Sequence, residues 1–196
     1  LFASRYMHRY GLTREQLAAI PVTFRKHAMV NPAAVYRSPL TVDEYLGSPT
    51  ISSPLCLFDC DVPIDGATAL VISDIAFAAD APRAAVQVHA LGTAVKTRTV
   101  LEGLEDFSRM PTVDVCAQSL WERSDITPQD IDFAYLYDGF SIIYIFWLEA
   151  LGFCERGAAA SFIGDGSAIT IGGRLPSNLD GGQLSAGRHH VLGYFY

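Results

Sequence analysis

Residues 135–153 read YLYDGFSIIYIFWLEALGF, in which the polar pair Asp138 and Gly139 precedes a long apolar stretch. Residues 133–137 predict a buried strand, and residues 140–151 predict an apolar helix in the core of the protein. Ligands of open α/β sheets usually bind where a strand ends and a helix begins. This stretch therefore predicts both an α/β layered fold and the place of a site within it. We expect Asp138 to cap the helix that follows it.

The rest of the chain alternates predicted helices with predicted strands. Thr13 is the expected cap of a helix over residues 13–27, which Pro21 is expected to bend or split. Further helices are predicted from residue 41 and over residues 112–122, and strands over residues 67–74 and 83–95. Residues 164–190 are rich in glycine and predict a long loop, of a length that is more often functional than idle. This loop carries no nucleotide-binding fingerprint.

The composition excludes several classes of protein. Lys and Arg number 14 and Asp and Glu number 21, so the net charge is −7, and no basic cluster offers a surface for nucleic acid or an anionic membrane. No apolar run approaches the roughly 20 residues of a membrane-spanning helix, and the first 11 residues lack the pattern of a secretory signal. We expect a cytoplasmic protein. The four cysteines form no CxxC pair, so reduced thiols are predicted rather than disulfides or a metal site.

Four segments, in order along the chain, resemble the thiolase superfamily in its sterol-carrier and lipid-transfer branch. They are GLTREQLAAI…NP, PLCLFDCDVPIDGATALVIS, ITPQDIDFAYLYDGFS…LEALGFCERG and GGRLPSNLDGGQLSAG. The resemblance implies a layered αβαβα fold built from two similar halves. The sequence starts without methionine and stops inside an apolar segment, so we expect an excerpt of a longer protein. Residues 1–78 would then be the end of the N-terminal half with a loop region, and residues 79–196 a truncated C-terminal half.

Two departures from the thiolase pattern change the expected chemistry. Where the resemblance implies a His-Asp-Cys-Phe loop, this chain has Tyr137 in the place of the histidine, followed by Asp-Gly-Phe. Where it implies a catalytic histidine after a Gly-Gly motif, this chain has Arg188, followed by His189 and His190. An arginine side chain stays protonated in proteins and cannot act as a general base. The nucleophilic cysteine of a thiolase would lie upstream of residue 1.

The resemblance is nearest to aldolases that cleave steroid side chains, in which tyrosines replace the thiolase cysteine and histidines. The tyrosines of the region are Tyr135, Tyr137, Tyr144, Tyr194 and Tyr196. We predict that Tyr144 and Tyr194 are catalytic, followed by Tyr137, with His190 as a further candidate. A phenolate needs a cation or a helix N-terminus to form near neutral pH, and Arg188 with the helix opening near Gly139 would supply both. The alternative for each tyrosine is that it is a core residue, whose hydroxyl makes an ordinary hydrogen bond and takes no part in catalysis.

The predicted function is retro-aldol cleavage of a β-hydroxyacyl-CoA side chain in steroid or lipid degradation. Coenzyme A would be part of the substrate, and no cofactor or metal bound by the chain is expected. Two alternatives stay open, an acyltransferase of the acetyl-CoA acetyltransferase type with a displaced histidine, and a non-catalytic carrier of lipid or acyl-CoA. The resemblance also implies a homodimer and a companion protein with a zinc ribbon and an OB-fold, of the DUF35 type.

Overall fold

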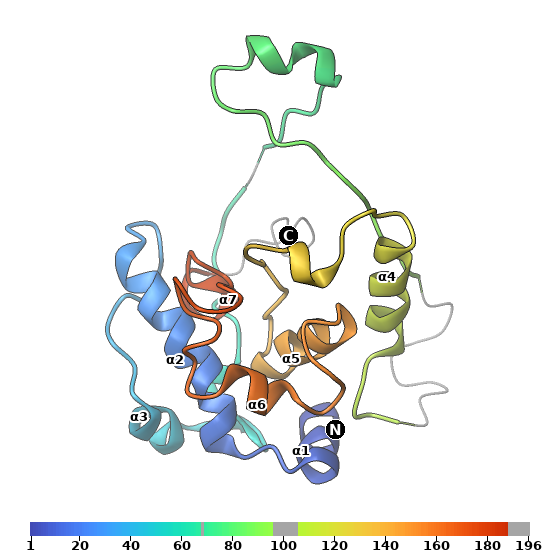
Figure 1. Ribbon diagram of the computed structural model, residues 1–196. Helices are drawn as coiled ribbons and strands as arrows, with labels where there is room; N and C mark the ends of the chain where they lie inside the picture. Colours follow the sequence, from blue (N-terminus) through green and yellow to red (C-terminus); the bar gives the residue numbers. More distant parts are fainter. Residues whose placement is uncertain (68, 96–105, 188–196) are drawn as a thin grey trace.

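The computed structural model describes residues 1–67, 69–95 and 106–187. Helices dominate this part of the chain (Figure 1). The α-helices are α1 (Phe2–Tyr10), α2 (Arg14–Val30), α3 (Val42–Gly47), α4 (Pro111–Trp121), α5 (Ser141–Ala150), α6 (Ala159–Ile163) and α7 (Gly182–Ser185). The short elements are the strands β1 (Thr50–Ser52) and β2 (Leu55–Cys56) and the 3₁₀ helices η1 (Leu57–Asp59), η2 (Ile75–Asp80) and η3 (Pro128–Asp130). β1 and β2 pair antiparallel.

α2 begins where the sequence predicts it. The side chain of Thr13 accepts a hydrogen bond from the Gln16 amide at 3.2 Å, and the Thr13 amide donates to the Gln16 side chain at 2.9 Å, which closes a capping box. The predicted split at Pro21 is wrong, because α2 runs unbroken to Val30, while the predicted bend stays a prediction. Its inner face is fully buried at Leu17, Ile20 and Phe24. That burial outweighs the one backbone hydrogen bond that a proline removes.

α5 confirms the prediction of a buried apolar helix. Tyr144, Ile145, Phe146 and Leu148 are each at most 1% exposed. The helix packs against α2, α4 and α6 and forms the centre of the main core. A helix satisfies its own backbone hydrogen bonds, so α5 can be apolar on every side once its neighbours surround it.

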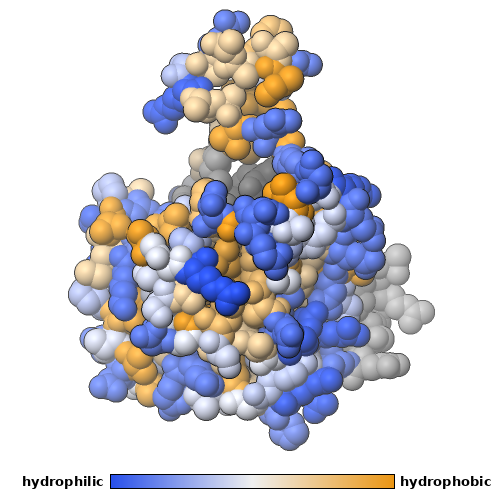
Figure 2. All heavy atoms as spheres, in the orientation of Figure 1, coloured by the Kyte–Doolittle hydropathy of each residue, from blue (hydrophilic) through white to orange (hydrophobic). Residues whose placement is uncertain are grey.

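The strands predicted over residues 67–74 and 83–95 are absent from the described part of the chain. We call residues 69–91 the arm. It stands away from the helices in Figure 1 and presents apolar side chains in Figure 2, with Val71 97% and Val86 94% exposed. The strand predicted over residues 133–137 is reduced to one parallel bridge between Ala134 and Ser177. A strand forms only when a neighbour completes its hydrogen bonds; the segments at residues 69–74 and 83–95 lack such a neighbour in the described residues, and residues 133–137 have only the short segment 176–178.

Several further expectations meet the structure. Among the described residues, no helix has the length and apolar character needed to cross a bilayer. All four cysteines are free thiols, as predicted. The predicted division between residues 78 and 79 falls within the arm and stays a prediction.

Candidate active site

Three segments meet at the N-terminal end of α5. Residues 57–62 contact residues 139–140 through the Asp61 amide, which donates to the Gly139 carbonyl at 3.2 Å, and through a bridge between Cys60 and Phe140. The Val62 amide donates to the Gln183 carbonyl at 3.0 Å. The other two segments, residues 134–140 and 176–186, lie side by side. The predicted junction of a strand with a helix is therefore present only in part, because α5 begins there but the strand is reduced to the bridge between Ala134 and Ser177.

Tyr144 lies one turn inside α5 and is 0% exposed. Its ring meets the ring of Phe24 edge-on, with centroids 5.2 Å apart. Within the described part of the chain its hydroxyl has no hydrogen-bond partner. Burial raises the pKa of Tyr144, the charge of Asp138 raises it further, and the hydroxyl of Ser177 lowers it. Tyr144 is therefore a neutral phenol with a proton to donate. This differs from the stabilised phenolate that the sequence suggests.

Tyr137 is half-buried and folds back over the start of α5. A Cβ atom at Gly139 would lie only 2.4 Å from the Tyr137 hydroxyl oxygen. A side chain at position 139 would therefore displace the Tyr137 phenol from the place that it occupies. Tyr137 lies just before α5 and Tyr144 lies near its first residues, so both tyrosines are close in sequence to the start of this helix.

Asp138 is buried, with 2% of its surface exposed, and its role differs from the prediction. It does not cap α5, whose N-cap residue Phe140 makes no side-chain capping bond. Instead its carboxylate accepts hydrogen bonds from the amides of Gln183 at 2.9 Å and Leu184 at 3.4 Å, in α7. A Cβ atom at Gly182 would lie 2.1 Å from the same carboxylate. Burial raises the pKa of Asp138 to about 7.

The hydroxyl of Ser141, the first residue of α5, donates a hydrogen bond to the carboxylate of Asp59. Asp59 is fully buried and also accepts from the Tyr45 hydroxyl at 2.8 Å and from the Cys56 amide at 2.8 Å. The start of α5 is therefore tied to the 57–62 segment by a carboxylate 82 residues earlier in the chain.

Asn178 is the residue of this region that sequence reasoning missed. Its backbone is left-handed, with φ 47°, and its side chain is 2% exposed. The side-chain oxygen accepts from the Leu136 amide at 2.8 Å, and the side-chain nitrogen donates to the Leu136 carbonyl at 2.9 Å. Asn178 therefore replaces a neighbouring strand for residue 136. Asparagine tolerates positive φ better than most residues, so its place just before the glycine pair was a usable signal.

His27 and Arg25 form the α2 side of this region. The His27 Nδ1 atom lies 3.2 Å from the Asn178 carbonyl oxygen, and burial lowers the pKa of the ring, so His27 is neutral. A neutral ring that meets a carbonyl at Nδ1 donates there, which leaves Nε2 as an acceptor. Arg25 donates to the Ser185 hydroxyl at 2.9 Å. Both residues hold the 176–186 segment against α2.

The remaining predicted site residues lie outside the described residues. These are Arg188, His189, His190, Tyr194 and Tyr196. The pairing of Tyr144 with Tyr194 stays a prediction, as does a role for His190. Tyr135 is described and half-buried, and burial raises its pKa.

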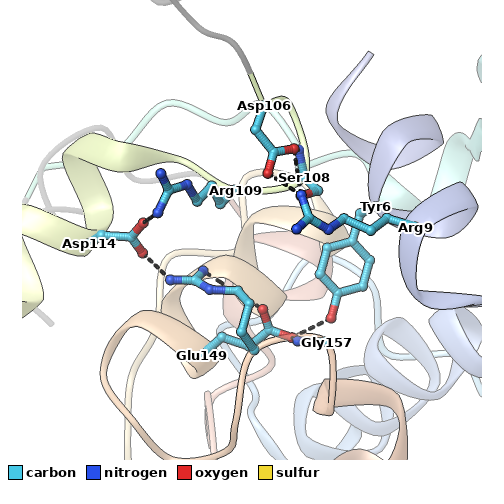
Figure 3. A network of polar contacts seen from close by, with 9 residues as sticks. Tyr6, Arg9, Asp106, Ser108, Arg109, Asp114, Glu149 and Gly157 are labelled. Carbon is cyan, nitrogen blue, oxygen red and sulfur yellow. Dashed lines mark hydrogen bonds and ion pairs between the residues drawn. The ribbon is translucent and has the colours of Figure 1, made fainter.

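A second polar cluster lies at the other end of α5 (Figure 3). Glu149 is buried, accepts a hydrogen bond from the Tyr6 hydroxyl, and accepts another from the Gly157 amide at 2.9 Å. Arg156 lies 3.8 Å from Glu149 and also pairs with Asp114 of α4. These contacts join α1, α4 and α5. They explain why a carboxylate interrupts the apolar run, and they mark a structural network rather than a second site.

Comparison with known proteins places the chain in the thiolase superfamily. The chain belongs to the family described as thiolase C-terminal domain-like, whose model matches residues 92–196. The resemblance predicted from the four sequence segments is therefore confirmed.

Named relatives extend this likeness over nearly the whole chain. The "17-hydroxy-3-oxo-4-pregnene-20-carboxyl-CoA lyase" of Mycobacterium tuberculosis is 39% identical over 196 residues, covering 98% of this chain and 50% of the relative. The "Steroid side-chain-cleaving aldolase" of Thermomonospora curvata is also 39% identical, with the same coverage. The solved "Ltp2-ChsH2(DUF35) aldolase" superposes with a TM-score of 0.83 and 38% identity, covering 94% of this chain and 49% of that one.

The chain thus spans about half the length of the relatives that it matches. The α/β fold is thiolase-like and is present here in part, as predicted.

Proposed function

We propose that this protein cleaves a carbon–carbon bond in the side chain of a steroid β-hydroxyacyl-CoA by a retro-aldol reaction. Two relatives with the likeness described above are named as a steroid side-chain-cleaving aldolase and a lyase of a steroid carboxyl-CoA. The observation that carries the proposal is the Tyr144 phenol, which is buried and whose hydroxyl makes no hydrogen bond of ordinary geometry among the described residues, because the neighbouring Ser177 hydroxyl, which lowers the pKa of Tyr144, donates to the Leu175 carbonyl. A buried hydroxyl without a partner costs stability, so its retention favours a role in chemistry.

The proposed reaction needs one base and one acid. The base removes the proton of the β-hydroxyl group, whose electrons form a carbonyl as the Cα–Cβ bond breaks. The electron pair of that bond becomes the enolate of the CoA thioester, and an acid then protonates its α-carbon. Tyr144 stays protonated at neutral pH because burial raises its pKa, so it has the proton that the acid must supply. Tyr194 is our first candidate for the base, followed by Tyr137 and His190. No acyl-enzyme is formed, so no nucleophilic cysteine is required.

The assembly of the protein is a further part of the proposal. We expect a homodimer, and we expect it to work with a companion of the DUF35 type, because a relative of known structure is the "Ltp2-ChsH2(DUF35) aldolase". A cytoplasmic location and coenzyme A as part of the substrate complete the proposal. Light scattering of the purified protein, alone and with the companion, measures both assemblies.

Substitution of the tyrosines tests the function. In the full-length protein, we expect Tyr144→Phe and Tyr194→Phe each to lower kcat for β-hydroxyacyl-CoA cleavage by about 10²- to 10⁴-fold, the usual contribution of a general acid or base. Tyr144→Phe should leave the melting temperature nearly unchanged, since its hydroxyl has no partner in the described region. Tyr10→Phe is the matched control, because Tyr10 lies in α1 beside Tyr6, whose hydroxyl bonds Glu149 at the other end of α5.

Normal turnover by both site variants would disprove the proposal. Acyl transfer to coenzyme A by the wild type would favour the acyltransferase instead. Saturable binding of acyl-CoA without bond cleavage would favour the carrier.

A further inference from the structure

The side chains of Asp138 and Asn178 connect two segments that are far apart in sequence. Asn178 makes both of its side-chain hydrogen bonds to the backbone of Leu136, and its own amide donates to the Ala134 carbonyl at 3.0 Å. Asp138 accepts from the amides of Gln183 and Leu184. Each of the two segments thus contributes one side chain that forms hydrogen bonds with the backbone of the other segment.

The geometry leaves little freedom at this junction. Gly182 has φ 60°, and its missing Cβ leaves the space that the Asp138 carboxylate fills. Gly181 has φ 108° and lies against Ala28 of α2, where a Cβ would come within 2.5 Å of the Ala28 Cβ. The glycine pair is therefore fitted between α2 and the carboxylate. Removal of the carboxylate would leave two buried amides without acceptors.

The junction lies directly beside the groups of the proposed reaction. Tyr137 precedes Asp138 in the chain, and the charge of Asp138 acts on the phenol of Tyr144. The glycine segment leads into residues 188–196, to which Tyr194 and His190 belong. Geometry that misplaces a catalytic group by about 1 Å can cost on the order of 100-fold in rate.

We infer that Asp138, held by Asn178, is a positioning residue that fixes the 181–187 glycine segment relative to Tyr137 and Tyr144. The inference rests on the proposed function for its effect on the reaction, while its effect on the glycine segment is independent of any activity. Asp138 supplies the acceptor that orders α7, and it takes no part in bond making or breaking.

The first experiment measures amide hydrogen exchange and kinetics of the full-length protein. In Asp138→Ala, we expect exchange at Gln183 and Leu184 to become at least about 10-fold faster, because both amides lose their acceptor. We expect kcat for β-hydroxyacyl-CoA cleavage to fall about 10- to 100-fold, with KM changed by less than about 3-fold. Asp138→Asn keeps one acceptor oxygen and should restore most of both quantities.

The matched control is Asp130→Ala. Asp130 also accepts hydrogen bonds from a backbone amide and a hydroxyl, both of Thr127, but it lies in an exposed turn. This control should leave exchange at residues 183 and 184 and kcat at their wild-type values. Exchange in Asp138→Ala that matches the wild type would overturn the inference, as would faster exchange with an unchanged kcat.

A second measurement decides the question if Asp138→Ala does not fold. The groups that act on the Asp138 carboxyl are the amides of Gln183 and Leu184, the Asn178 side chain and the carboxylate of Asp180. Tyr144 is the phenol that its charge affects. Protection of the two amides in the wild type should fall as pH rises from 5 to about 7, because an ionised Asp138 is better solvated when the segment opens. In Asp138→Asn it should not change with pH.

Equal pH dependence in the two proteins would reject the positioning role. The exchange results also separate this inference from the proposed function. If the wild type cleaves no β-hydroxyacyl-CoA, the proposed function fails while exchange still decides the contact. If the wild type is active and Asp138→Ala matches it in exchange and kcat, only the positioning role fails.

Discussion

α5 and the arm are both apolar in sequence, and they have opposite surroundings in the structure. Ile145 and Leu148 of α5 are fully buried, whereas Val71 and Ile72 of the arm are 97% and 83% exposed. A helix makes its backbone hydrogen bonds within itself and needs only surfaces to pack against. An extended segment needs another strand before its side chains can form a buried face. Apolar sequence therefore predicts burial only when its secondary structure can be completed.

The largest effect on the free energy of unfolding is expected when a large side chain is removed from α5. Phe146 is 1% exposed and meets the rings of Phe2 and Tyr6 edge-on. We expect Phe146→Ala to lower the free energy of unfolding by about 3–5 kcal/mol, from lost apolar burial and the cavity left behind. Urea unfolding followed by circular dichroism measures it. A loss below about 1 kcal/mol would show that α5 is not the centre of the core.

The next largest effect concerns a segment that is extended yet held in place. Asn178→Ala removes both side-chain bonds to Leu136 and leaves a buried amide and carbonyl without those partners. We expect a loss of about 2–4 kcal/mol in the free energy of unfolding. Asn31→Ala, which removes a partly buried bond to the Asp180 carbonyl, should cost about 1 kcal/mol. Equal losses in the two variants would contradict the special role of Asn178.

A pH titration sharpens the same comparison at Asp138. Burial raises its pKa in the folded protein to about 7, from the ordinary aspartate value of 3.8. Between these two values the folded state holds a proton that the unfolded state has lost, so this contribution to stability falls as pH rises and levels off above about pH 7. Relative to Asp138→Asn, the wild type should lose at most about 1.4 kcal/mol per pH unit in this window. A constant difference from pH 4 to 8 would refute the assignment.

The smallest effect is expected in the arm. Val71→Ser should change the free energy of unfolding by less than about 0.5 kcal/mol, because an exposed valine contributes little packing. Thermal unfolding of the variant beside the wild type is sufficient. A loss of 1–3 kcal/mol would show that Val71 is buried in the full-length protein, and the contrast with α5 would then disappear.

Local signals in the sequence predicted α2, α3, α4 and α5, whereas α1, α6 and α7 were not predicted and the strands were predicted poorly. The Thr13 cap and the apolar run of α5 each act within a few residues, so they can be recognised without knowing the fold. The predicted strands at residues 67–74 and 83–95 depended on partners that the local sequence does not reveal. Pro21 was overrated as a helix breaker because the burial of its neighbours is a tertiary effect.

The candidate site shows the same division. The stretch around Tyr137 and Tyr144 was found because it stands out in one continuous sequence. The bonds of Asn178 to Leu136 span 42 residues, and the bond of Asp138 to Gln183 spans 45. Because nothing local marks such partners, Asn178 was missed and Asp138 was assigned to the nearest helix. Long-range contacts of this kind become visible only in the folded protein.

The crossed bonds between residues 134–138 and 176–184 also limit how the protein can move. The two segments are held together as one rigid unit, since a shift of either would break several buried hydrogen bonds at once. Any motion that exposes the Tyr144 hydroxyl must therefore leave this unit intact. Phe24, whose ring meets that of Tyr144, lies on α2, and α2 is held to the same unit by Arg25 and His27, so α2 is expected to move together with it.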